Sequence, residues 1–269
     1  MELVEDSSGI TYQKRTGWRE EEVAMLPERL KGLVTTYFKS DYLTLPPRTF
    51  QVIKLEVTAK LKRIAKALMD AAPNTISGLT WLRTLSSGFQ YGETGDERTL
   101  VETKCPKDDA LRQILDEDEP NGRVVLFASF QGSIDRVQTI CQEKGWMVAR
   151  IDGRGWKVFD VGGKELHGET VLGAWANRGE KMALVGNPAS CRFGLTLVEA
   201  KTVCYFDQGF SAEHRLQSMD RIYRIGQTEP TRVVDLVHLP VDQLILDVLK
   251  DNGKMEDLSL GRIREALEE

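Results

Sequence analysis

The chain has 269 residues, of which 41% are hydrophobic and 29% are charged, and its formal net charge is −5. This length and composition predict a folded chain with a buried core, arranged as one large α/β domain or two small ones. The longest apolar stretches, such as Val124 to Phe127, are far shorter than the roughly twenty residues that a membrane-spanning helix needs, so we expect no membrane-spanning helix. The acidic N-terminus has no signal-peptide pattern, so we expect a cytoplasmic, intracellular location.

Cysteine and histidine spacing gives no support to metal chemistry. The sequence contains neither a Cys-x-x-Cys nor a His-x-x-x-His pair, which argues against a zinc site and against a disulfide framework. We therefore expect no metal, and reduced, buried thiols at Cys105, Cys141, Cys191 and Cys204. Acidic residues gather in 105–122 and 235–269 and leave the remainder net positive, so the acidic total does not exclude a polyanionic partner.

The chain changes character near its middle. The first hundred residues lack a strand–helix rhythm and predict helices over 20–31 and 58–72. Residues 45–48, Leu-Pro-Pro-Arg, are predicted to be extended, because a proline disfavours the helical conformation of the residue before it. After the acidic stretch 116–122, short apolar runs alternate with amphipathic segments, which is typical of a parallel sheet with crossover helices.

The apolar runs and periodicities locate the individual elements and predict an α/β fold. The predicted strands are 124–129, 147–151, 182–185, 202–206 and 232–239. The predicted helices in this part are 134–145, 170–177, 212–227, 244–252 and 258–269.

The segment 212–227 is the most informative part of the sequence. Helical spacing places Gln217, Asp220, Arg221 and Arg224 on one face, opposite an apolar face. One interpretation is a solvated face with an Asp–Arg pair one turn apart. The other is that the two arginines grip a phosphate chain, since the planar guanidinium binds phosphate oxygens in pairs. Helical spacing alone does not decide between them.

The same segment resembles a motif of a known family. Residues 217–227, Gln-Ser-Met-Asp-Arg-Ile-Tyr-Arg-Ile-Gly-Gln, resemble the sixth motif of the SWI/SNF-type superfamily-two helicases, which are double-stranded DNA translocases that include chromatin remodellers. Residues 188–200 are similar to the fifth motif, particularly in bacterial and phage members. Residues 124–130 resemble the fourth motif, 151–153 the element after it, and 45–48 the segment that leaves the first lobe. The resemblance covers 105–250 well and 28–60 weakly.

The resemblance implies a RecA-like second lobe, a parallel sheet flanked by helices and preceded by a mainly helical connector. Such a lobe supplies arginine fingers to ATP and Mg²⁺, held mainly by a first lobe that this chain lacks. The implied fingers are Arg221 and Arg224, supported by Gln217 and Asp220. The residues implied at the nucleotide are Gly194, Leu195, Gly226 and Gln227. The residues implied at DNA are Ser129, Phe130, Asp152, Gly153, Ser190 and Thr196.

Departures from the family are as informative as matches. Arg192 and Phe193 are bulkier than the family's usual residues before Gly194. A P-loop requires Gly-Lys followed by Ser or Thr, but the two Gly-Lys pairs here precede Glu165 and Met255. We therefore expect this chain alone to be inactive as an ATPase.

The interpretation that follows is the C-terminal half of a DNA-dependent ATPase. It divides the chain into the end of lobe one with a helical connector (1–104), the second lobe (105–252) and a helical tail (253–269). The expected partners are double-stranded DNA and a first lobe in the same parent protein or on a separate chain, in a bacterial or phage-infected cell, with no membrane contact. The alternative, favoured by the missing P-loop, is a non-catalytic DNA- or protein-binding module.

Overall fold

The computed structural model describes residues 2–5, 11–14, 20–34, 43–94, 97–168, 170–177, 179–192, 194–250, 265 and 267. Contacts divide the chain into two compact units, residues 1–44 and 45–269. In the first unit, β1 (Glu2–Glu5) pairs antiparallel with β2 (Thr11–Lys14), and α1 (Glu20–Arg29) lies where a helix was predicted. Within the described ranges, no helix is long and apolar enough to cross a membrane.

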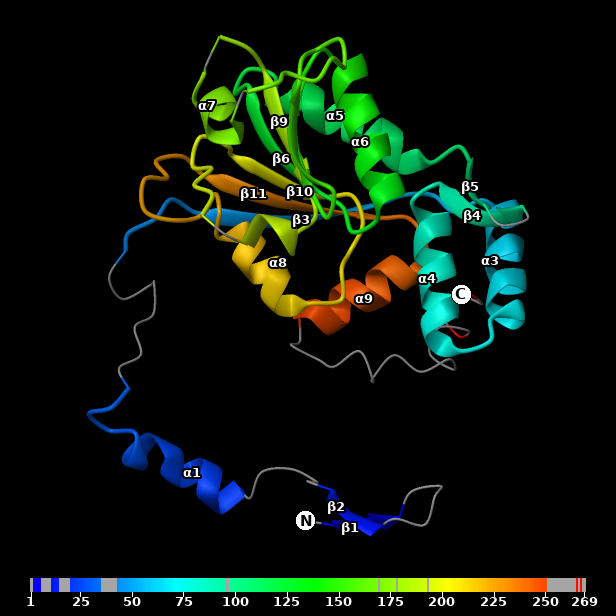
Figure 1. Cartoon of the computed structure of the whole chain (residues 1–269), viewed down its shortest axis with the longest axis vertical. Coiled ribbons are helices and arrows are strands. Elements are labelled where there is room, and N and C mark those ends of the chain that lie inside the picture. The colour runs from blue at the N-terminus through cyan, green and yellow to red at the C-terminus, as the bar shows by residue number, and fades with distance from the viewer. Residues whose placement is uncertain are drawn as a thin grey trace. The chain divides into compact units, whose positions relative to one another are not determined.

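The second unit is built on a seven-stranded sheet with the strand order β3-β11-β10-β6-β9-β7-β8 (Figure 1). Its strands are β3 (Arg48–Lys54), β6 (Arg123–Phe127), β7 (Met147–Asp152), β8 (Gly155–Phe159), β9 (Met182–Gly186), β10 (Thr202–Tyr205) and β11 (Thr231–Val237). Neighbouring strands are parallel except for β8, which forms a hairpin with β7. The five predicted strands and the parallel α/β sheet are confirmed.

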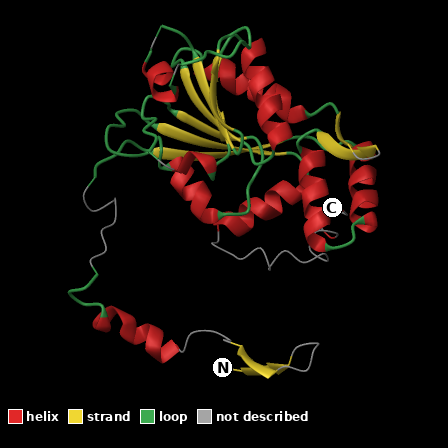
Figure 2. Cartoon of the chain, viewed as in Figure 1, coloured by secondary structure: helices red, strands yellow, loops and turns green. Residues whose placement is uncertain are grey.

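Helices cover both faces of this sheet and form a cluster at its side (Figure 2). The helices of the lobe are α5 (Pro106–Asp118), α6 (Gln131–Glu143), α7 (Val171–Ala176), α8 (Ala212–Met219) and α9 (Pro240–Lys250). Before them come α3 (Ala59–Ala71), α4 (Thr75–Ser86) and a hairpin of β4 (Phe89–Thr94) and β5 (Glu97–Glu102). In the predicted tail, Glu265 and Leu267 are helical, and the other residues of 253–269 lie outside the described ranges.

Strand side chains alternate between two cores, as the pleat of a sheet dictates. Val124 and Leu126 of β6 pack in the core that includes residues of α5 and α6. Val125 and Phe127 of the same strand pack in the opposite core, with residues of α7 and of the segment that follows α8. Because both faces are covered, β6 reads as a continuous apolar run, which is why the sequence located it.

A third core joins the connector helices α3 and α4 to α9. A buried ion pair lies at this junction: Lys107 Nζ is 2.9 Å from Asp242 Oδ2, and neither side chain is more than 2% exposed. The same carboxylate accepts hydrogen bonds from Ser86 Oγ (2.5 Å) and from the His238 backbone N–H (2.9 Å). Helices α4, α5 and α9 and the end of β11 therefore meet at one carboxylate.

The predicted helix over 212–227 is shorter in the structure and ends at Met219, with Asp220 as its C-cap. Two carbonyls beyond this point bond outside a helical ladder: Arg221 O accepts from Leu197 N–H (3.0 Å), and Ile222 O accepts from Gln227 Nε2 (3.2 Å). Because these bonds use carbonyls that a longer helix would need, residues 220–226 form turns instead. The prediction that Arg221 and Arg224 share one helical face is wrong.

Candidate functional site

The carboxyl ends of β6, β7, β9 and β10 lie at one edge of the sheet, because these strands are parallel. Hydrogen bonds tie the loops there together. Asn187 N–H donates to Ile151 O (3.0 Å), Asn187 Nδ2 donates to Ser129 O (3.0 Å), and Ser129 N–H donates to Asp207 Oδ1 (2.6 Å). The loops after β6, β9 and β10 are therefore cross-linked by side chains, and the loop after β9 also bonds to β7.

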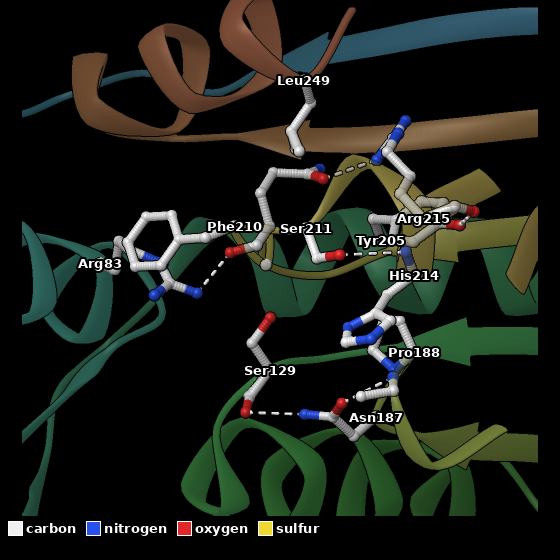
Figure 3. A pocket seen from close by; sticks show the side chains of 13 residues that line it. Arg83, Ser129, Asn187, Pro188, Tyr205, Phe210, Ser211, His214, Arg215 and Leu249 are labelled. Carbon is white, nitrogen blue, oxygen red and sulfur yellow. Dashed lines mark hydrogen bonds between the residues drawn. The ribbon is translucent and has the colours of Figure 1, made fainter. Parts of the chain in front are cut away.

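A pocket of about 400 Å³, called here the edge pocket, opens among these loops. Figure 3 shows Ser129 and Asn187 on one side of it and Phe210 and Ser211 on the other. Its lining comprises Arg83, Ser129, Asn187, Pro188, Ala189, Tyr205, Gln208, Gly209, Phe210, Ser211, His214, Arg215 and Leu249. The pocket thus joins connector helix α4 to loops at the carboxyl edge and to the start of α8.

Phe130 packs inward, beside Arg83. Its ring meets Phe89 edge-on, with 6.0 Å between ring centroids, and the Arg83 guanidinium carbon lies 4.4 Å from its centroid. Arg83 is 5% exposed, and its Nη2 donates to the Gln208 carbonyl. These contacts give Phe130 a packing role, and its assignment to DNA stays a prediction.

Asp152 and Gly153 lie at the tip of the β7–β8 hairpin. The Asp152 carboxylate is nearly buried and accepts hydrogen bonds from the Arg154 backbone N–H (2.8 Å) and from Arg154 Nη2 (2.5 Å). Burial alone would raise the pKa of Asp152, but the hydrogen bonds from Arg154 outweigh it and hold this pKa below its usual value. Gly153 is exposed. The carboxylate is therefore ionised and already occupied by Arg154.

The loop after β9 presents the residues that resemble the fifth motif. Ser190, Gly194 and Thr196 are exposed, whereas Leu195 packs against the core. Gly194 has a φ of +71°, a left-handed conformation that favours glycine. The Arg192 side chain and Phe193 lie outside the described residues. The loop therefore exposes two hydroxyl side chains on either side of a glycine in the left-handed conformation.

The arginine-bearing turn, residues 220–227, packs directly on this loop. Arg221 Nη1 lies 3.4 Å from Leu195 O, and Leu197 N–H donates to Arg221 O (3.0 Å). Arg221 and Arg224 are half-buried, and Gly226 is exposed with a φ of +101°. The residues resembling the fifth and sixth motifs are therefore in direct contact.

Gln217 and Asp220 each contact a residue other than these two arginines. Gln217 Nε2 donates to Glu213 Oε1 one turn earlier on α8 (2.8 Å). Asp220 Oδ1 lies 3.9 Å from Arg48 Nη1, and Asp220 closes α8. Their support of the arginines stays a prediction.

Gln227 is buried, at 6% exposed, and its amide reaches across the turn. Its Nε2 lies within hydrogen-bonding distance of the carbonyls of Val198 (3.0 Å), Ala200 (3.1 Å) and Ile222 (3.2 Å). Its Oε1 accepts from Glu229 N–H (3.0 Å). Gln227 therefore pins the arginine-bearing turn to the preceding loop, and its predicted contact with nucleotide stays untested.

Sequence reasoning missed several residues of this site, because no local pattern identifies their partners. Arg83 bonds a carbonyl 125 residues later. Arg215 bonds Gln208 Oε1 (2.6 Å) and pairs with Asp235 (2.8 Å), and the carbon of its guanidinium lies 4.1 Å from the centroid of the Tyr205 ring. A single arginine in a helix is a weak signal, and only the folded chain identifies what it contacts.

The four cysteines are free and buried, as predicted. Burial raises the pKa of the Cys105 thiol to about 11 and that of Cys191 to about 12, so both stay protonated at neutral pH. Within the part of the chain that the structure describes, no group of three or more His, Cys, Asp or Glu side chains is arranged to hold a metal ion.

The fold has counterparts among known proteins. The sheet with helices on both faces is that of a RecA-like helicase lobe, and residues 106–226 match the helicase conserved C-terminal domain. Curated proteins that are similar to this chain include chromatin remodellers.

Curated relatives match most of this chain but extend well beyond it. It is 26% identical to the CHD3-type chromatin-remodeling factor PICKLE of Arabidopsis thaliana, over 91% of this chain and 19% of that protein. It is 25% identical to the ISWI chromatin-remodeling complex ATPase CHR11 of the same plant, over 80% of this chain and 21% of that protein. The chain thus spans about a fifth of their length. These relatives give no support to the expected bacterial or phage origin.

Two solved structures share the fold. The C-terminal part of the Fun30 ATPase domain superposes with a TM-score of 0.54 and 15% identity, over 84% of this chain and 97% of that one. The Sulfolobus solfataricus SWI2/SNF2 ATPase core in complex with dsDNA gives a TM-score of 0.53 and 19% identity, over 90% of this chain and 56% of that one. At these identities the likeness establishes the fold alone.

Proposed function

We propose that this chain is the C-terminal half of a DNA-dependent ATPase that translocates on double-stranded DNA. The observation that carries the proposal is that hydrogen bonds join the arginine-bearing turn to the loop 194–200. The turn with Arg221 and Arg224 is pinned to the loop 194–200 by Gln227 and by the Leu197 N–H. A nucleotide at the turn and a DNA strand at the loop would therefore act on one connected element.

In this proposal, ATP and Mg²⁺ are held mainly by a first lobe, in the same parent protein or on a separate chain. Arg221 and Arg224 reach the transferring phosphoryl group and stabilise its charge, with Gln217 and Asp220 in support. Gly194, Leu195, Gly226 and Gln227 shape the nucleotide side of the turn and loop. Hydrolysis opens and closes the cleft between the lobes.

DNA contacts in the proposal are made to phosphates and carry no sequence information. Ser190 and Thr196 are exposed hydroxyls on the loop after β9 and are suited to donate to phosphate oxygens. Ser129 lies on the neighbouring loop, with Phe130 packed behind it. Asp152 and Gly153 form the hairpin tip, where Asp152 acts through Arg154, which it holds.

The test combines DNA binding with phosphate release. The chain alone is expected to bind duplex DNA and to release no phosphate from ATP. Mixed with the first lobe of an SNF2 ATPase, it is expected to give DNA-stimulated phosphate release. The Arg221→Ala, Arg224→Ala double variant should lower that release by on the order of 10³-fold while DNA binding persists. Arg112→Ala, a surface control, should leave phosphate release unchanged.

Two results would contradict the proposal. Robust turnover by the chain alone would mean that it holds ATP without a first lobe. The second result is binding of DNA or protein without ATP turnover in any mixture, at an affinity that replacement of both arginines does not change. That result would favour the non-catalytic binding module, which the absent P-loop already supports.

A further inference from the structure

We propose that the edge pocket binds a phosphate group of the DNA backbone, with Arg83, Ser129 and His214 as its ligands. This inference rests on the proposed function, since it assumes that DNA passes the carboxyl edge of the sheet. It adds a site that includes a connector-helix arginine, which lies outside every helicase-like motif of the sequence.

The charge of the lining suits an anion. Two arginines and a histidine line the edge pocket, and its lining includes no aspartate or glutamate. The charge of Arg215 is balanced by Asp235, 2.8 Å away. Asp207 and Asp242 influence Arg83 electrostatically, but no carboxylate lies within salt-bridge distance of its guanidinium among the described residues. Arg83 is therefore the cation that a phosphate in the pocket would meet.

Arg83 is held in a fixed orientation. Its guanidinium carbon lies 4.4 Å from the centroid of the Phe130 ring and 4.1 Å from that of the Phe210 ring. Because aromatic rings pack against the guanidinium, we expect a ligand to accept hydrogen bonds from its N–H groups. Of these groups, Nη2 donates to the Gln208 carbonyl, and Nε has no hydrogen-bond partner in the described part of the chain. Burial lowers the pKa of Arg83, a penalty that an anion would relieve.

A second unused polar atom lies on the opposite wall. Ser129 Oγ is buried and has no hydrogen-bond partner within the described ranges. Figure 3 shows this hydroxyl directed into the pocket, across from Phe210 and Ser211. A buried hydroxyl without a partner costs free energy. A phosphate oxygen would satisfy it.

The start of α8 completes the site. Ser211 is the N-cap, its Oγ accepts from His214 N–H (3.2 Å), and both residues line the pocket. The N-terminal end of a helix carries a partial positive charge and favours anions. Asn187 and Pro188, from the loop after β9, line the same pocket, so it is continuous with the loops assigned to DNA. This continuity favours a backbone phosphate over free phosphate.

The experiment measures binding of the full chain to a short fluorescent duplex as a function of salt. Arg83→Gln is expected to weaken binding about tenfold and to reduce the slope of log affinity against log salt by about one. Ser129→Ala is expected to weaken binding with the slope unchanged. Its matched control is Ser133→Ala, since Ser133 Oγ is also buried and without a recorded partner but does not line the pocket.

The outcomes separate this proposal from the proposed function. Failure of the wild-type chain to bind duplex DNA would contradict the proposed function itself. Normal DNA affinity and salt slope in a folded Arg83→Gln variant would overturn the phosphate site alone. If Arg83→Gln does not fold, the DNA affinity of His214→Ala is compared with that of His167→Ala, a control at an exposed histidine. Equal DNA affinities in these two variants would overturn the proposed phosphate site.

A titration with inorganic phosphate tests whether the pocket binds a DNA phosphate or free phosphate. For a backbone site, the His214 ring resonance should respond to inorganic phosphate only in the millimolar range. Saturation at micromolar phosphate, with DNA affinity indifferent to Arg83→Gln, would overturn the assignment to DNA.

Discussion

The guanidinium of Arg48 lies over the ring of Tyr223, with 4.4 Å between its carbon and the ring centroid. Arg48 opens β3, the edge strand that begins the second unit, and Tyr223 lies between Arg221 and Arg224 in the turn after α8. The 3.9 Å approach of Arg48 to Asp220 adds an electrostatic contact. The segment that resembles the exit from a first lobe is thereby fastened to the turn that bears both arginines.

Arg48→Ala is expected to lower the free energy of unfolding by about 1 kcal/mol, the usual strength of a partly exposed cation–π contact. It should also loosen the arginine-bearing turn. Hydrogen exchange at the Leu197 amide, which donates to Arg221 O, reports this and should accelerate. Lys54→Ala, at the other end of β3, is the control, and equal exchange rates in the two variants would contradict the coupling.

The two glutamines of the motif are expected to contribute very different amounts to the free energy of unfolding. Gln227→Ala removes an amide that serves three carbonyls, so we expect a loss of about 2 kcal/mol in the free energy of unfolding. Gln217→Ala removes only a bond to Glu213 along α8 and should cost a few tenths of a kcal/mol. Urea denaturation of both variants measures the difference, and similar losses would argue against a pinning role for Gln227.

The Lys107–Asp242 pair is expected to be highly sensitive to replacement of one partner. Lys107→Met leaves the Asp242 carboxylate buried, with hydrogen bonds from the Ser86 hydroxyl and the His238 backbone N–H. We expect the free energy of unfolding to fall by about 3 kcal/mol. Lys104→Met, three residues earlier and exposed, should be nearly neutral. Thermal unfolding of the two variants makes the comparison, and a stable Lys107→Met variant would show that the pair contributes little.

The hairpin at Asp152 predicts a pH dependence. The folded-state pKa of Asp152 is lowered, so its contribution to stability is present above the ordinary aspartate pKa of about 3.9 and is lost as the pH falls through the folded-state value. Asp152→Asn should be destabilised by on the order of 1 kcal/mol at neutral pH, since Arg154 is partly solvated. The difference in Tm from the wild type should shrink below about pH 4.

A variant at an exposed carboxylate provides the comparison for this titration. Asp109 is 76% exposed and pairs only with Arg112 among the salt bridges recorded for the described residues. Asp109→Asn should match the wild-type Tm at every pH. If the Tm of Asp152→Asn is lower than that of the wild type by the same amount at every pH, the lost contact is not ionic.

The five central strands were predictable because strands buried on both faces are apolar whatever surrounds them. The two edge strands were not. β3 follows two prolines and has mixed polarity, and β8 is a short antiparallel return at Gly155, whose φ is +96°. An edge strand exposes part of its surface, so its local pattern resembles that of a loop until a neighbouring strand is known.

The motif residues were also identified from the sequence, because their order and spacing are local properties. Their geometry was not. Helical periodicity extended α8 through Arg224, but the helix ends at Met219, and the carbonyls of Arg221 and Ile222 accept hydrogen bonds from Leu197 N–H and Gln227 Nε2. Phe130, expected at DNA, packs against Arg83.

The sequence by itself determined the α/β class, the order of the central strands along the chain and the resemblance to helicase motifs, since these depend on local apolar runs and spacings. Only the tertiary structure decided that α8 ends early, that Arg48 fastens the arginine-bearing turn, and that Arg83 lines the edge pocket. Each of these features depends on a hydrogen bond or ring contact between residues far apart in the chain, and such contacts leave no periodic trace in the sequence.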